Sequence, residues 1–459
     1  MKIYSENSNY KLYQGNMLDM LEVIEPSSID SVICDPPYEL NFMGKGWDNS
    51  GIAFQSDTWK KCYEVLKPGG YLLAFGGSRT FHRIACAIED AGFEIRDTIM
   101  WLYGSGFPKS MNIGLSIDKR NHVESKVIGK SKSGSTSKAF NLNEQQREAG
   151  TGILAGEYDL KEAQNEWNGW GTALKPSFEP IIVARKPFKG SLVDNVIEYG
   201  VGGINIDECR IESNIESDPN YRPNAYNHKG HGYTFGSESK RNTKDLPDSG
   251  FHNSLGRFPA NTILTYDETD FDEVCGGFPD TKSTGGKGEA TANTAMFFGN
   301  GNNGKLRANA GGLGDSGSAS RYFYCAKASK KDRDEGLDLF NQEKVNDGRQ
   351  TPIDNAFQRG ETLRKNTHPT VKPTTLMQYL VRLVTPDGGT VLDPFNGSGS
   401  TGKAVMYENK EKNKNYKYIG IELTEEYLPI SKARIEYVCN LKEKKESQLT
   451  IFDLENNNE

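Results

Sequence analysis

An acid, two prolines and an aromatic residue follow one another at Asp35-Pro36-Pro37-Tyr38, directly after the apolar run SIDSVI. The run predicts a buried strand, so the four residues stand where that strand ends. Prolines stiffen the backbone and donate no hydrogen bond, which leaves a carboxylate and a backbone carbonyl as acceptors beside a ring. Asp-Pro is also common in turns, so an acid that only caps a turn is the alternative.

A second stretch of this kind is VLDPFNGSGSTG, in which Asp393 ends a predicted strand and a glycine loop leads into a helix. Such a loop brings backbone N–H groups and a helix N-terminus close to a ligand, and Gly397 and Gly399 allow a close approach. The same kind of loop also serves packing. Glu422 ends the next predicted strand, YIGIEL, and an acid there suits the diol of a ribose. Together these residues predict a ligand that contains a nucleoside.

Strands and helices alternate around both stretches. The expected strands cover 28–33, 71–77, 93–101, 178–187, 389–395 and 416–423, and the expected helices 58–66, 79–91 and 374–384. Lys67-Pro68-Gly69-Gly70 is expected to stop the first helix, Ser78 to cap the second and Gly92 to end it. Strands separated by helices of this length predict a parallel, doubly wound sheet.

The regular pattern fails in the centre of the chain, between about residues 106 and 170 and again from about 190 to 360. Twelve glycines stand between Gly276 and Gly317, in a polar stretch too poor in apolar residues to form a core. These segments look inserted into a sheet assembled from both chain ends. The expected fold class is α/β: a Rossmann-like, doubly wound, mostly parallel sheet with an irregular central insertion.

Composition limits the class of protein further. No apolar stretch approaches the roughly 18 residues of a membrane span, and the N-terminus has no apolar region for secretion. Seven cysteines without a C-x-x-C pair suit a reducing cytoplasm. A net charge of -7 argues against non-specific coating of nucleic acid. Between Lys109 and Lys138, however, seven basic residues face two acids, which suits a solvated loop or a segment that contacts phosphates.

The combination of DPPY (Asp35 to Tyr38) with DPFNGSGSTG (Asp393 to Gly402) resembles the amino-methyltransferases that modify DNA using S-adenosylmethionine. The order of catalytic motif, central region and cofactor motif is similar to the beta class of that family. HPTVKP (His368 to Pro373) resembles the family's additional cofactor-binding motif. LKPGGYLLAFGGSRTFHR and KPSFEPIIVARKP resemble stretches of phage and prophage members.

The resemblance covers residues 10 to 125, 170 to 190 and 320 to 438. It implies six parts of the chain. They are a catalytic half over 1–115, a basic insertion over 116–171, a returning strand over 172–190, a target-recognition region over 191–355, a cofactor-binding half over 356–440 and a flexible acidic tail over 441–459.

The family's mechanism implies a role for each residue of the first motif. The Asp35 carboxylate and the Pro36 carbonyl accept the N–H groups of an exocyclic base amine, while Pro37 stiffens the turn. Tyr38 stacks on a base that has been flipped out of the duplex. Asp at position 35 resembles adenine-N6 members more than most cytosine-N4 members, so adenine is expected and cytosine is the alternative. A cofactor-binding DNA-recognition protein without turnover is the alternative of a different class.

The resemblance and the glycine loop together predict a set of cofactor-binding residues. They are Asn16, Asp19, His368, Lys372, Asp393, Phe395, Gly397, Ser398, Gly399, Thr401 and Glu422. Relatives commonly have an acid where this chain has Asn16. Its side-chain oxygen can still accept a hydrogen bond from the cofactor's adenine amine, and Asp19 is the nearby alternative.

Residues that contact DNA are harder to identify, because base contacts come from the irregular centre. The candidates are Lys45, Trp101, Lys109, Lys119, Arg120, Arg222, Lys229 and Arg241. A position in the core is the alternative for Trp101. His228, His231, Cys209 and Cys275 have irregular spacing, so no metal site is predicted.

The C-terminal segment QLTIFDL follows the charged linker KEKKES. It resembles the peptide by which bacterial replication and repair proteins dock on the sliding clamp, with Gln448, Leu449, Ile451 and Phe452 at the anchor positions. A tail strand packed on the sheet is the alternative. The expected partners are double-stranded DNA, the clamp and a second copy in a homodimer.

Overall fold

The computed structural model of the chain describes ten stretches of residues. They are 2–40, 46–103, 110–132, 157–211, 257–265, 280–282, 316–318, 324–325, 330–346 and 361–455. Five candidates for DNA contact lie outside the described residues, namely Lys45, Lys109, Arg222, Lys229 and Arg241. Most of the glycine-rich stretch lies outside them as well.

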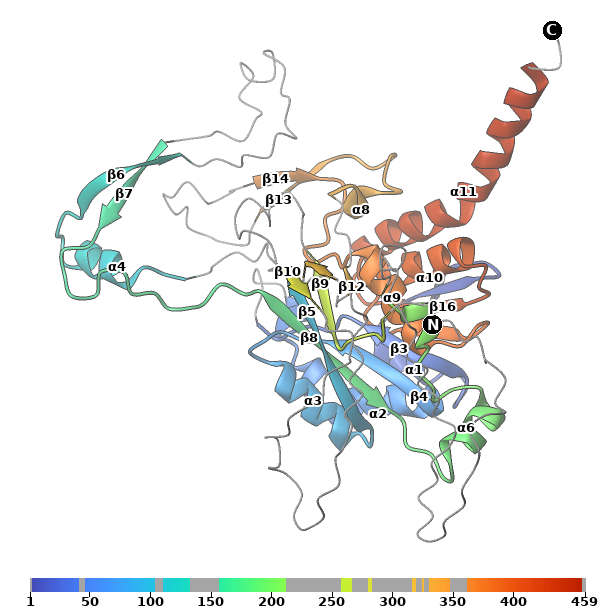
Figure 1. The fold of residues 1–459 in the computed structure, drawn as a ribbon. Coiled ribbons are helices and arrows are strands. Elements are labelled where there is room, and N and C mark those ends of the chain that lie inside the picture. Colours follow the sequence, from blue (N-terminus) through green and yellow to red (C-terminus); the bar gives the residue numbers. More distant parts are fainter. Residues whose placement is uncertain are drawn as a thin grey trace, which may run out of the picture.

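A ten-stranded sheet forms the centre of the molecule (Figure 1). Its strands in spatial order are β1 (Lys2–Glu6), β2 (Tyr10–Gln14), β16 (Lys417–Glu422), β15 (Thr390–Asp393), β3 (Ile29–Cys34), β4 (Leu66–Phe75), β8 (Phe178–Arg185), β5 (Glu94–Tyr103), β9 (Thr262–Thr265) and β12 (Tyr324–Cys325). Neighbours are parallel except at the pair β1–β2 and on both sides of β8. The predicted α/β class with a mostly parallel sheet is confirmed.

Both ends of the chain meet in the middle of this sheet. β15, from the C-terminal part, lies between β16 and β3, and Val391 pairs with Ser31. The backbone N–H of Thr390 also donates to the Asp30 carboxylate at 2.7 Å. Since β3 and β15 are parallel, the two sequence motifs that follow them lie at the same edge.

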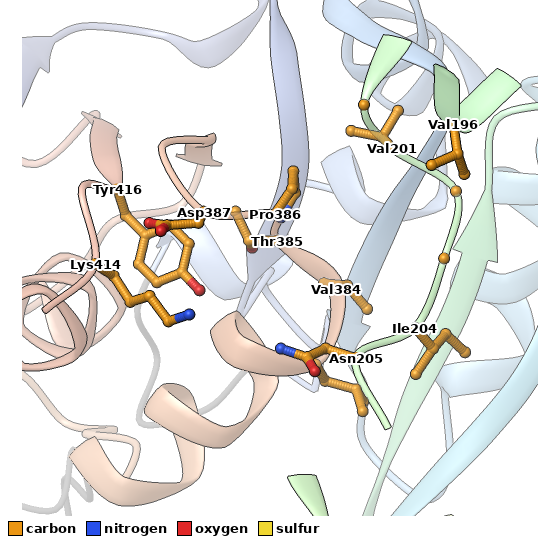
Figure 2. A pocket seen from close by; sticks show the side chains of 14 residues that line it. Val196, Val201, Ile204, Asn205, Val384, Thr385, Pro386, Asp387, Lys414 and Tyr416 are labelled. Atoms are coloured by element: carbon orange, nitrogen blue, oxygen red, sulfur yellow. The ribbon is translucent and has the colours of Figure 1, made fainter. Parts of the chain in front are cut away.

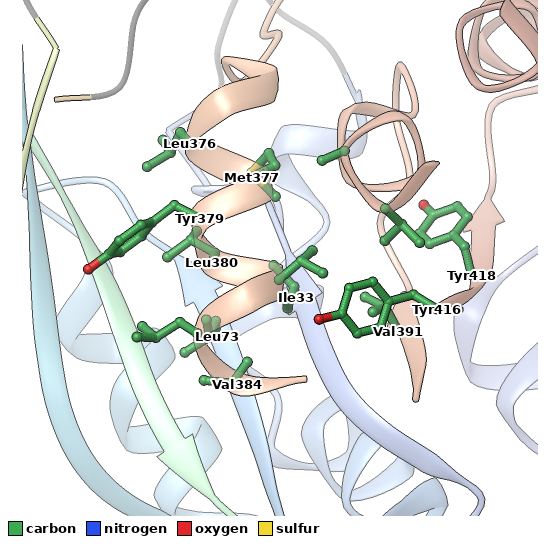
Figure 3. Close-up of a cluster of buried hydrophobic side chains, with 14 of the residues drawn as sticks. Ile33, Leu73, Leu376, Met377, Tyr379, Leu380, Val384, Val391, Tyr416 and Tyr418 are labelled. Carbon is green, nitrogen blue, oxygen red and sulfur yellow. The ribbon is translucent and has the colours of Figure 1, made fainter. Parts of the chain in front are cut away.

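Helices cover both faces of the sheet. They are α1 (Met17–Leu21), α2 (Ser56–Val65), α3 (Phe81–Asp90), α9 (Thr374–Val384), α10 (Ser400–Glu411) and α11 (Leu428–Glu455). Ile33 and Val391 pack with α9 in one buried cluster (Figure 3), whereas their neighbours Val32 and Leu392 join a second cluster with α2 and α3. Successive residues of a strand face opposite sides, so helices on both faces leave the central strands buried throughout.

Helix α2 ends at Val65, before Lys67-Pro68-Gly69-Gly70 as expected, but these four residues belong to a strand, because β4 begins at Leu66. The reason is tertiary: the Gly69 N–H donates to the Lys186 carbonyl at 3.0 Å, and the Pro68 carbonyl accepts from Asn195 at 3.1 Å. Helix α3 follows Thr80 without a side-chain cap, so Ser78 is not its cap. Gly92 does end it, with φ of 104°.

The sheet domain reaches further into the centre of the chain than expected. Helix α6 (Leu192–Tyr199) packs on β4, Cys209 is buried in the α9 cluster, and β9 pairs with β5. These residues fall inside the region expected to recognise DNA. The expected boundary at residue 115 lies within helix α4 (Ile113–Arg120). This helix and the hairpin of β6 (Lys126–Lys132) and β7 (Glu157–Glu162) form a lobe that stands away from the sheet (Figure 1).

The remaining described elements are short. They are the 3-10 helices η2 (Gly46–Asn49), η3 (Ile52–Phe54), η4 (Asp207–Cys209) and η8 (Glu425–Tyr427), the strand pairs β10 (Asp280–Lys282) with β11 (Ser316–Ser318) and β13 (Glu343–Asn346) with β14 (Glu361–Arg364), and helix α8 (Lys330–Asp334). Helix α11 continues to Glu455, so the backbone at 448–452 is helical and does not form the tail strand given as the alternative. No helix in the described parts of the chain is long and apolar enough to cross a membrane.

A cleft of about 250 Å³ opens where Gly200–Asn205 approach the end of α9 (Figure 2). Pro386 in its wall precedes β15, and Lys414 precedes β16. The cleft therefore lies at the amino ends of these strands. Ligands of open parallel sheets bind at the carboxyl ends, where both sequence motifs stand.

A buried ion cluster ties α8 to the cofactor-binding half. The Lys403 ammonium is fully buried and lies 2.6 Å from the Asp332 carboxylate and 2.8 Å from that of Glu335. Asp332 also accepts the Thr374 N–H at 2.6 Å, at the start of α9. The side chain of Arg434, likewise fully buried, donates to the Ser398 carbonyl at 2.7 Å. The segment at 332–335 thus braces the glycine loop and α9 together.

Replacing Lys403 by alanine should destabilise the protein by about 3–5 kcal/mol, because the Asp332 and Glu335 carboxylates lose their nearest cation and Asp332 keeps, among the described cations, only Arg434 at 3.8 Å. Urea unfolding measures the change. Lys61→Ala is the matched control, since its ion pair with Glu22 at 3.3 Å is exposed to solvent and should shift the midpoint little. Equal losses for both variants would contradict the bracing role of this cluster.

Candidate active site

The topology gathers polar residues at one edge of the sheet. Asp35 directly follows β3, and Asp393 and Glu422 end β15 and β16. β8 runs the other way, so its first residues lie at this same edge, and Glu179 pairs with Trp101 near the end of β5. A single antiparallel strand therefore adds a fourth acid, Glu179, to this edge.

The turn after Asp35 is held by a second acid. Asp48 is 2% exposed, and its carboxylate accepts the backbone N–H groups of Glu39 at 3.0 Å and Leu40 at 3.2 Å. Glu39 has φ of 55°, a left-handed conformation that the two bonds stabilise. Gly77, after β4, leaves room for the Tyr38 ring, since a Cβ there would lie 3.2 Å from Tyr38 Cδ2.

The Asp35 carboxylate is paired on one side only. Its Oδ2 accepts a hydrogen bond from the Lys372 ammonium at 2.6 Å. Its Oδ1 is buried and has no hydrogen-bond partner among the described residues. A buried acceptor without a donor is costly, so this atom marks the place of a ligand donor.

Glu179 holds the other groups around Asp35. Its Oε2 lies 3.4 Å from the Lys372 ammonium and accepts the Tyr38 hydroxyl at 2.8 Å, while Oε1 accepts the Tyr103 hydroxyl at 3.4 Å. Burial, Asp35 and Glu179 raise the pKa of Tyr38 well above its usual value, so its phenol stays neutral. Burial raises the pKa of Tyr103 to about 12. Burial lowers the pKa of Lys372, but Asp35 and Glu179 outweigh it and the net pKa is raised.

Trp101 packs beneath these polar groups. It is 8% exposed, its ring contacts Phe75 and Tyr103, and its Nε1–H donates to the Thr265 hydroxyl at 2.9 Å. This position agrees with the core alternative, because most of the Trp101 side chain is covered by its neighbours.

The glycine loop lies beside the HPTVKP segment. A Cβ on Gly397 would lie 2.9 Å from His368 Nε2, and Gly397 has φ of 51°, so a side chain is excluded twice. The Gly397 N–H donates to the Glu422 carboxylate at 2.6 Å. Burial lowers the pKa of His368 to about 4, so the imidazole is neutral.

Other residues of the loop face inward. A Cβ on Gly399 would meet the Ser431 hydroxyl at 2.5 Å, so this glycine serves packing against α11. The Ser398 hydroxyl accepts from Arg434 at 3.1 Å, and Phe395 packs its ring against Trp59. The side chains of Ser398 and Phe395 therefore contact other parts of the protein and support the conformation of the glycine loop.

Residues at the end of β2 complete the edge. The Asn16 side-chain oxygen accepts the Leu18 N–H at 3.0 Å and caps α1, while Asp19 is exposed in the first turn of that helix. Gln14, which pairs with Glu422, has a buried side-chain oxygen without a partner among the described residues. The expected adenine contact of Asn16 thus competes with its capping bond, and Gln14 offers a second acceptor.

The polar groups at this edge of the sheet suit a cofactor that contains a nucleoside. The free Gln14 oxygen, the Glu422 carboxylate and the glycine at 397 stand where an adenosine needs acceptors and close backbone approach. The unpaired oxygen of Asp35 marks the neighbouring place for a donor. The residues present therefore fit S-adenosylmethionine.

Asp48, Glu179, Tyr103 and Gln14 were not identified from the sequence. Only Glu179 carries a local signal, because it is the one charge at the start of the apolar run PIIVA. Lys119 and Arg120 are exposed in the outlying lobe, away from these groups. No group of three or more metal-ligating side chains occurs in the described stretches, where Cys209 is a core residue; His228, His231 and Cys275 lie outside them.

The ionisation of Asp393 predicts a pH dependence of stability. Burial raises its pKa to about 7, against hydrogen bonds from the Thr401 hydroxyl and the Phe395 N–H that favour the anion. The folded state then holds a proton between about pH 4 and 7 that the unfolded chain has lost, so the free energy of unfolding falls as pH rises through this window.

Asp393→Asn replaces the titrating carboxyl group by an amide that does not ionise in this pH range. The stability of the wild type relative to Asp393→Asn should fall by about 4 kcal/mol between pH 4 and pH 7, at 1.36 kcal/mol per pH unit. Urea unfolding at several pH values measures the difference, and other titrating groups cancel because both proteins share them. A difference that stays constant with pH would show that Asp393 is ionised throughout.

The chain is similar in sequence to a family of known proteins. The family described as DNA methylase matches residues 29–433. The type II methyltransferase M2.LlaDCHI of Lactococcus lactis is 25% identical over 234 residues, covering 44% of this chain and 82% of that protein. The type II methyltransferase M.HindIII of Haemophilus influenzae is 25% identical over 238 residues, covering 42% of this chain and 64% of that protein.

Solved structures are similar at lower identity. The cytosine-N4-specific PvuII DNA methyltransferase is 13% identical, covers 94% of this chain and 90% of its own, and has a TM-score of 0.40. The M1.HpyAVI complex with S-adenosylmethionine is 13% identical, with 93% and 98% covered and a TM-score of 0.36. Because the family match includes both motifs and the strands that carry them, the chain belongs to the N6/N4 DNA methylase family.

Proposed function

We propose that this DNA methylase transfers a methyl group to the exocyclic N6 of adenine at a specific site in duplex DNA. The family's cofactor, S-adenosylmethionine, supplies a methyl group on a positively charged sulfur. The observation that carries the proposal is the unpaired, buried Oδ1 of Asp35 at the carboxyl edge of the sheet.

An exocyclic amine is a poor nucleophile because its lone pair is delocalised into the ring. Hydrogen bonds from its two N–H groups to Asp35 Oδ1 and the Pro36 carbonyl favour a pyramidal nitrogen and return the pair to it. With the pair returned to it, the nitrogen could attack a methyl group that the bound cofactor would supply, and the amine would lose one proton to solvent. Tyr38, whose hydroxyl donates to Glu179, would stack on the flipped base. Positioning and polarisation supply the rate, so no covalent intermediate with the protein is needed.

Asp35 supports adenine over cytosine, since Asp at this position resembles adenine-N6 members. Cytosine N4 is the second candidate, because its amine presents the same two N–H groups. A DNA-binding protein without turnover is disfavoured by the complete set of Asp35, Pro36, Pro37 and Tyr38. Contacts of DNA with Lys119 and Arg120 of the lobe, a phage origin and homodimer formation stay predictions of the sequence.

Sequencing of modified bases in cells that express the chain should find N6-methyladenine at one short motif. Asp35→Ala should abolish the signal, with activity on purified DNA reduced about 100-fold or more, because the amine loses its principal acceptor. Ser8→Ala, at an exposed position before β2, is the control and should leave methylation unchanged. N4-methylcytosine would transfer the assignment to cytosine, and no modified base would contradict enzymatic function.

The resemblance of Gln448–Phe452 to a clamp-docking peptide predicts that the chain binds the bacterial sliding clamp. Phe452→Ala should then weaken retention of the full chain on immobilised clamp at least tenfold, with Asn457→Ala as the control outside the motif. Equal retention of both variants and the wild type would contradict docking through this segment.

A further inference from the structure

Lys372 belongs to the segment that resembles a cofactor-binding motif, but its ammonium lies beside the Asp35-to-Tyr38 motif. The HPTVKP segment resembles a cofactor-binding motif, and His368 indeed contacts the glycine loop at Gly397. Four residues later the chain has turned toward the other motif, and the Lys372 ammonium lies 2.6 Å from Asp35 and 3.4 Å from Glu179. Its side chain is 8% exposed, so the ammonium is fixed within the site.

The ammonium has a donor that these acids leave unused. A lysine carries three N–H donors, and the carboxylates of Asp35 and Glu179 account for two of them. The rings of Phe75 and Tyr38 lie 4.9 Å and 5.3 Å from the ammonium and restrict where it can move. The ammonium lies 2.6 Å from Oδ2 of the same carboxylate whose Oδ1 has no partner among the described residues, so an available donor and an available acceptor occur in one part of the site.

An acceptor next to a donor matches one chemical pattern in nucleic acid bases. In adenine the N6 amine is bonded to the carbon that also carries N1, an acceptor; in cytosine the N4 amine has the same relation to N3. Thymine offers a carbonyl and an N–H in this position, which would set acceptor against acceptor and donor against donor. Guanine likewise presents a carbonyl and an N–H along this edge.

We propose that Lys372 donates a hydrogen bond to the ring nitrogen next to the target amine and so determines which bases the site accepts. This inference rests on the proposed amino-methyltransferase function and deepens it. Asp35 Oδ1 takes the amine N–H while Lys372 takes the ring nitrogen, and together they read an amidine edge. Glu179 is the positioning residue, because it holds both Lys372 and Tyr38.

The pairing also explains why a lysine, and not a neutral donor, stands at this position. Asp35 and Glu179 approach the same ammonium, and without it two carboxylates would face a neutral, desolvated base. The ammonium offsets part of their charge while leaving Asp35 Oδ1 as an acceptor. A ring nitrogen that accepts from a charged donor gains a stronger bond than one that accepts from an amide.

The test removes the ring nitrogen and the donor separately. Duplexes carry the methylated site found by sequencing, with the target adenine replaced by 1-deazaadenine, in which C–H replaces N1; for a cytosine target, 3-deazacytosine is used. For the wild type, kcat/KM should fall roughly 10- to 100-fold on the deaza duplex, as expected for loss of one charge-assisted hydrogen bond. For Lys372→Met, kcat/KM should be low on both duplexes and their ratio should be near one.

Replacing the ring nitrogen also changes the reactivity of the amine, but this change is the same for every protein variant. Comparing the ratio of kcat/KM on the two duplexes between variants therefore isolates the hydrogen bond from Lys372. Lys372→Gln keeps an N–H donor and should retain part of the ratio, which keeps the test open if the methionine variant does not fold. Lys186→Met is the matched control: Lys186 is also 8% exposed, but it donates to the Tyr63 and Leu66 carbonyls away from the site. It should keep the wild-type ratio.

A wild-type ratio of one, or an undiminished ratio in Lys372→Met, would overturn the inference. If Lys372→Met raised the KM for S-adenosylmethionine but kept the wild-type ratio of kcat/KM on the two duplexes, Lys372 would bind the cofactor and not the base. Absence of methylation by the wild type on every DNA would instead contradict the proposed function itself.

Discussion

The parallel pairing of β3 with β15 is the constraint on which the site depends. These strands come from opposite ends of the chain, and their contact sets Asp35 and Asp393 at one edge of the sheet. Every other feature of the site builds on this contact: α9 crosses behind β3, and the segment before α9 carries Lys372 to Asp35. Neither half of the chain contains the site alone.

Local sequence was sufficient where periodicity is strong and the helix or strand is buried. The predicted helix at 374–384 has those bounds in the structure, because its apolar residues repeat at helical spacing. The strands before Asp35 and Asp393 were likewise predicted, since buried parallel strands read as short apolar runs. The position of both motifs at the ends of strands could therefore be predicted from local sequence alone.

Long-range contacts account for what the sequence did not reveal. Lys67-Pro68-Gly69-Gly70 has turn-forming residues, yet hydrogen bonds to Lys186, directly after β8, and to Asn195 of α6 hold it as a strand. The capping bond of Asn16 and the position of Lys372 on Asp35 also depend on partners that no spacing predicts. Glu179 was overlooked for a topological reason: only the reversed direction of β8 brings the start of that strand to the edge where the other strands end.

The reversed β8 has a consequence for how such an enzyme can change. The lobe of α4, β6 and β7 leaves the sheet after Tyr103 and returns before Phe178, and these attachment points are hydrogen-bonded neighbours, with the Tyr103 N–H donating to the Ser177 carbonyl at 2.9 Å. Its two ends are closed together by the sheet itself, so its length and content can vary with little strain on the strands beneath. The lobe is thus a module whose length and content can change while the described strands that carry the site keep their pairing.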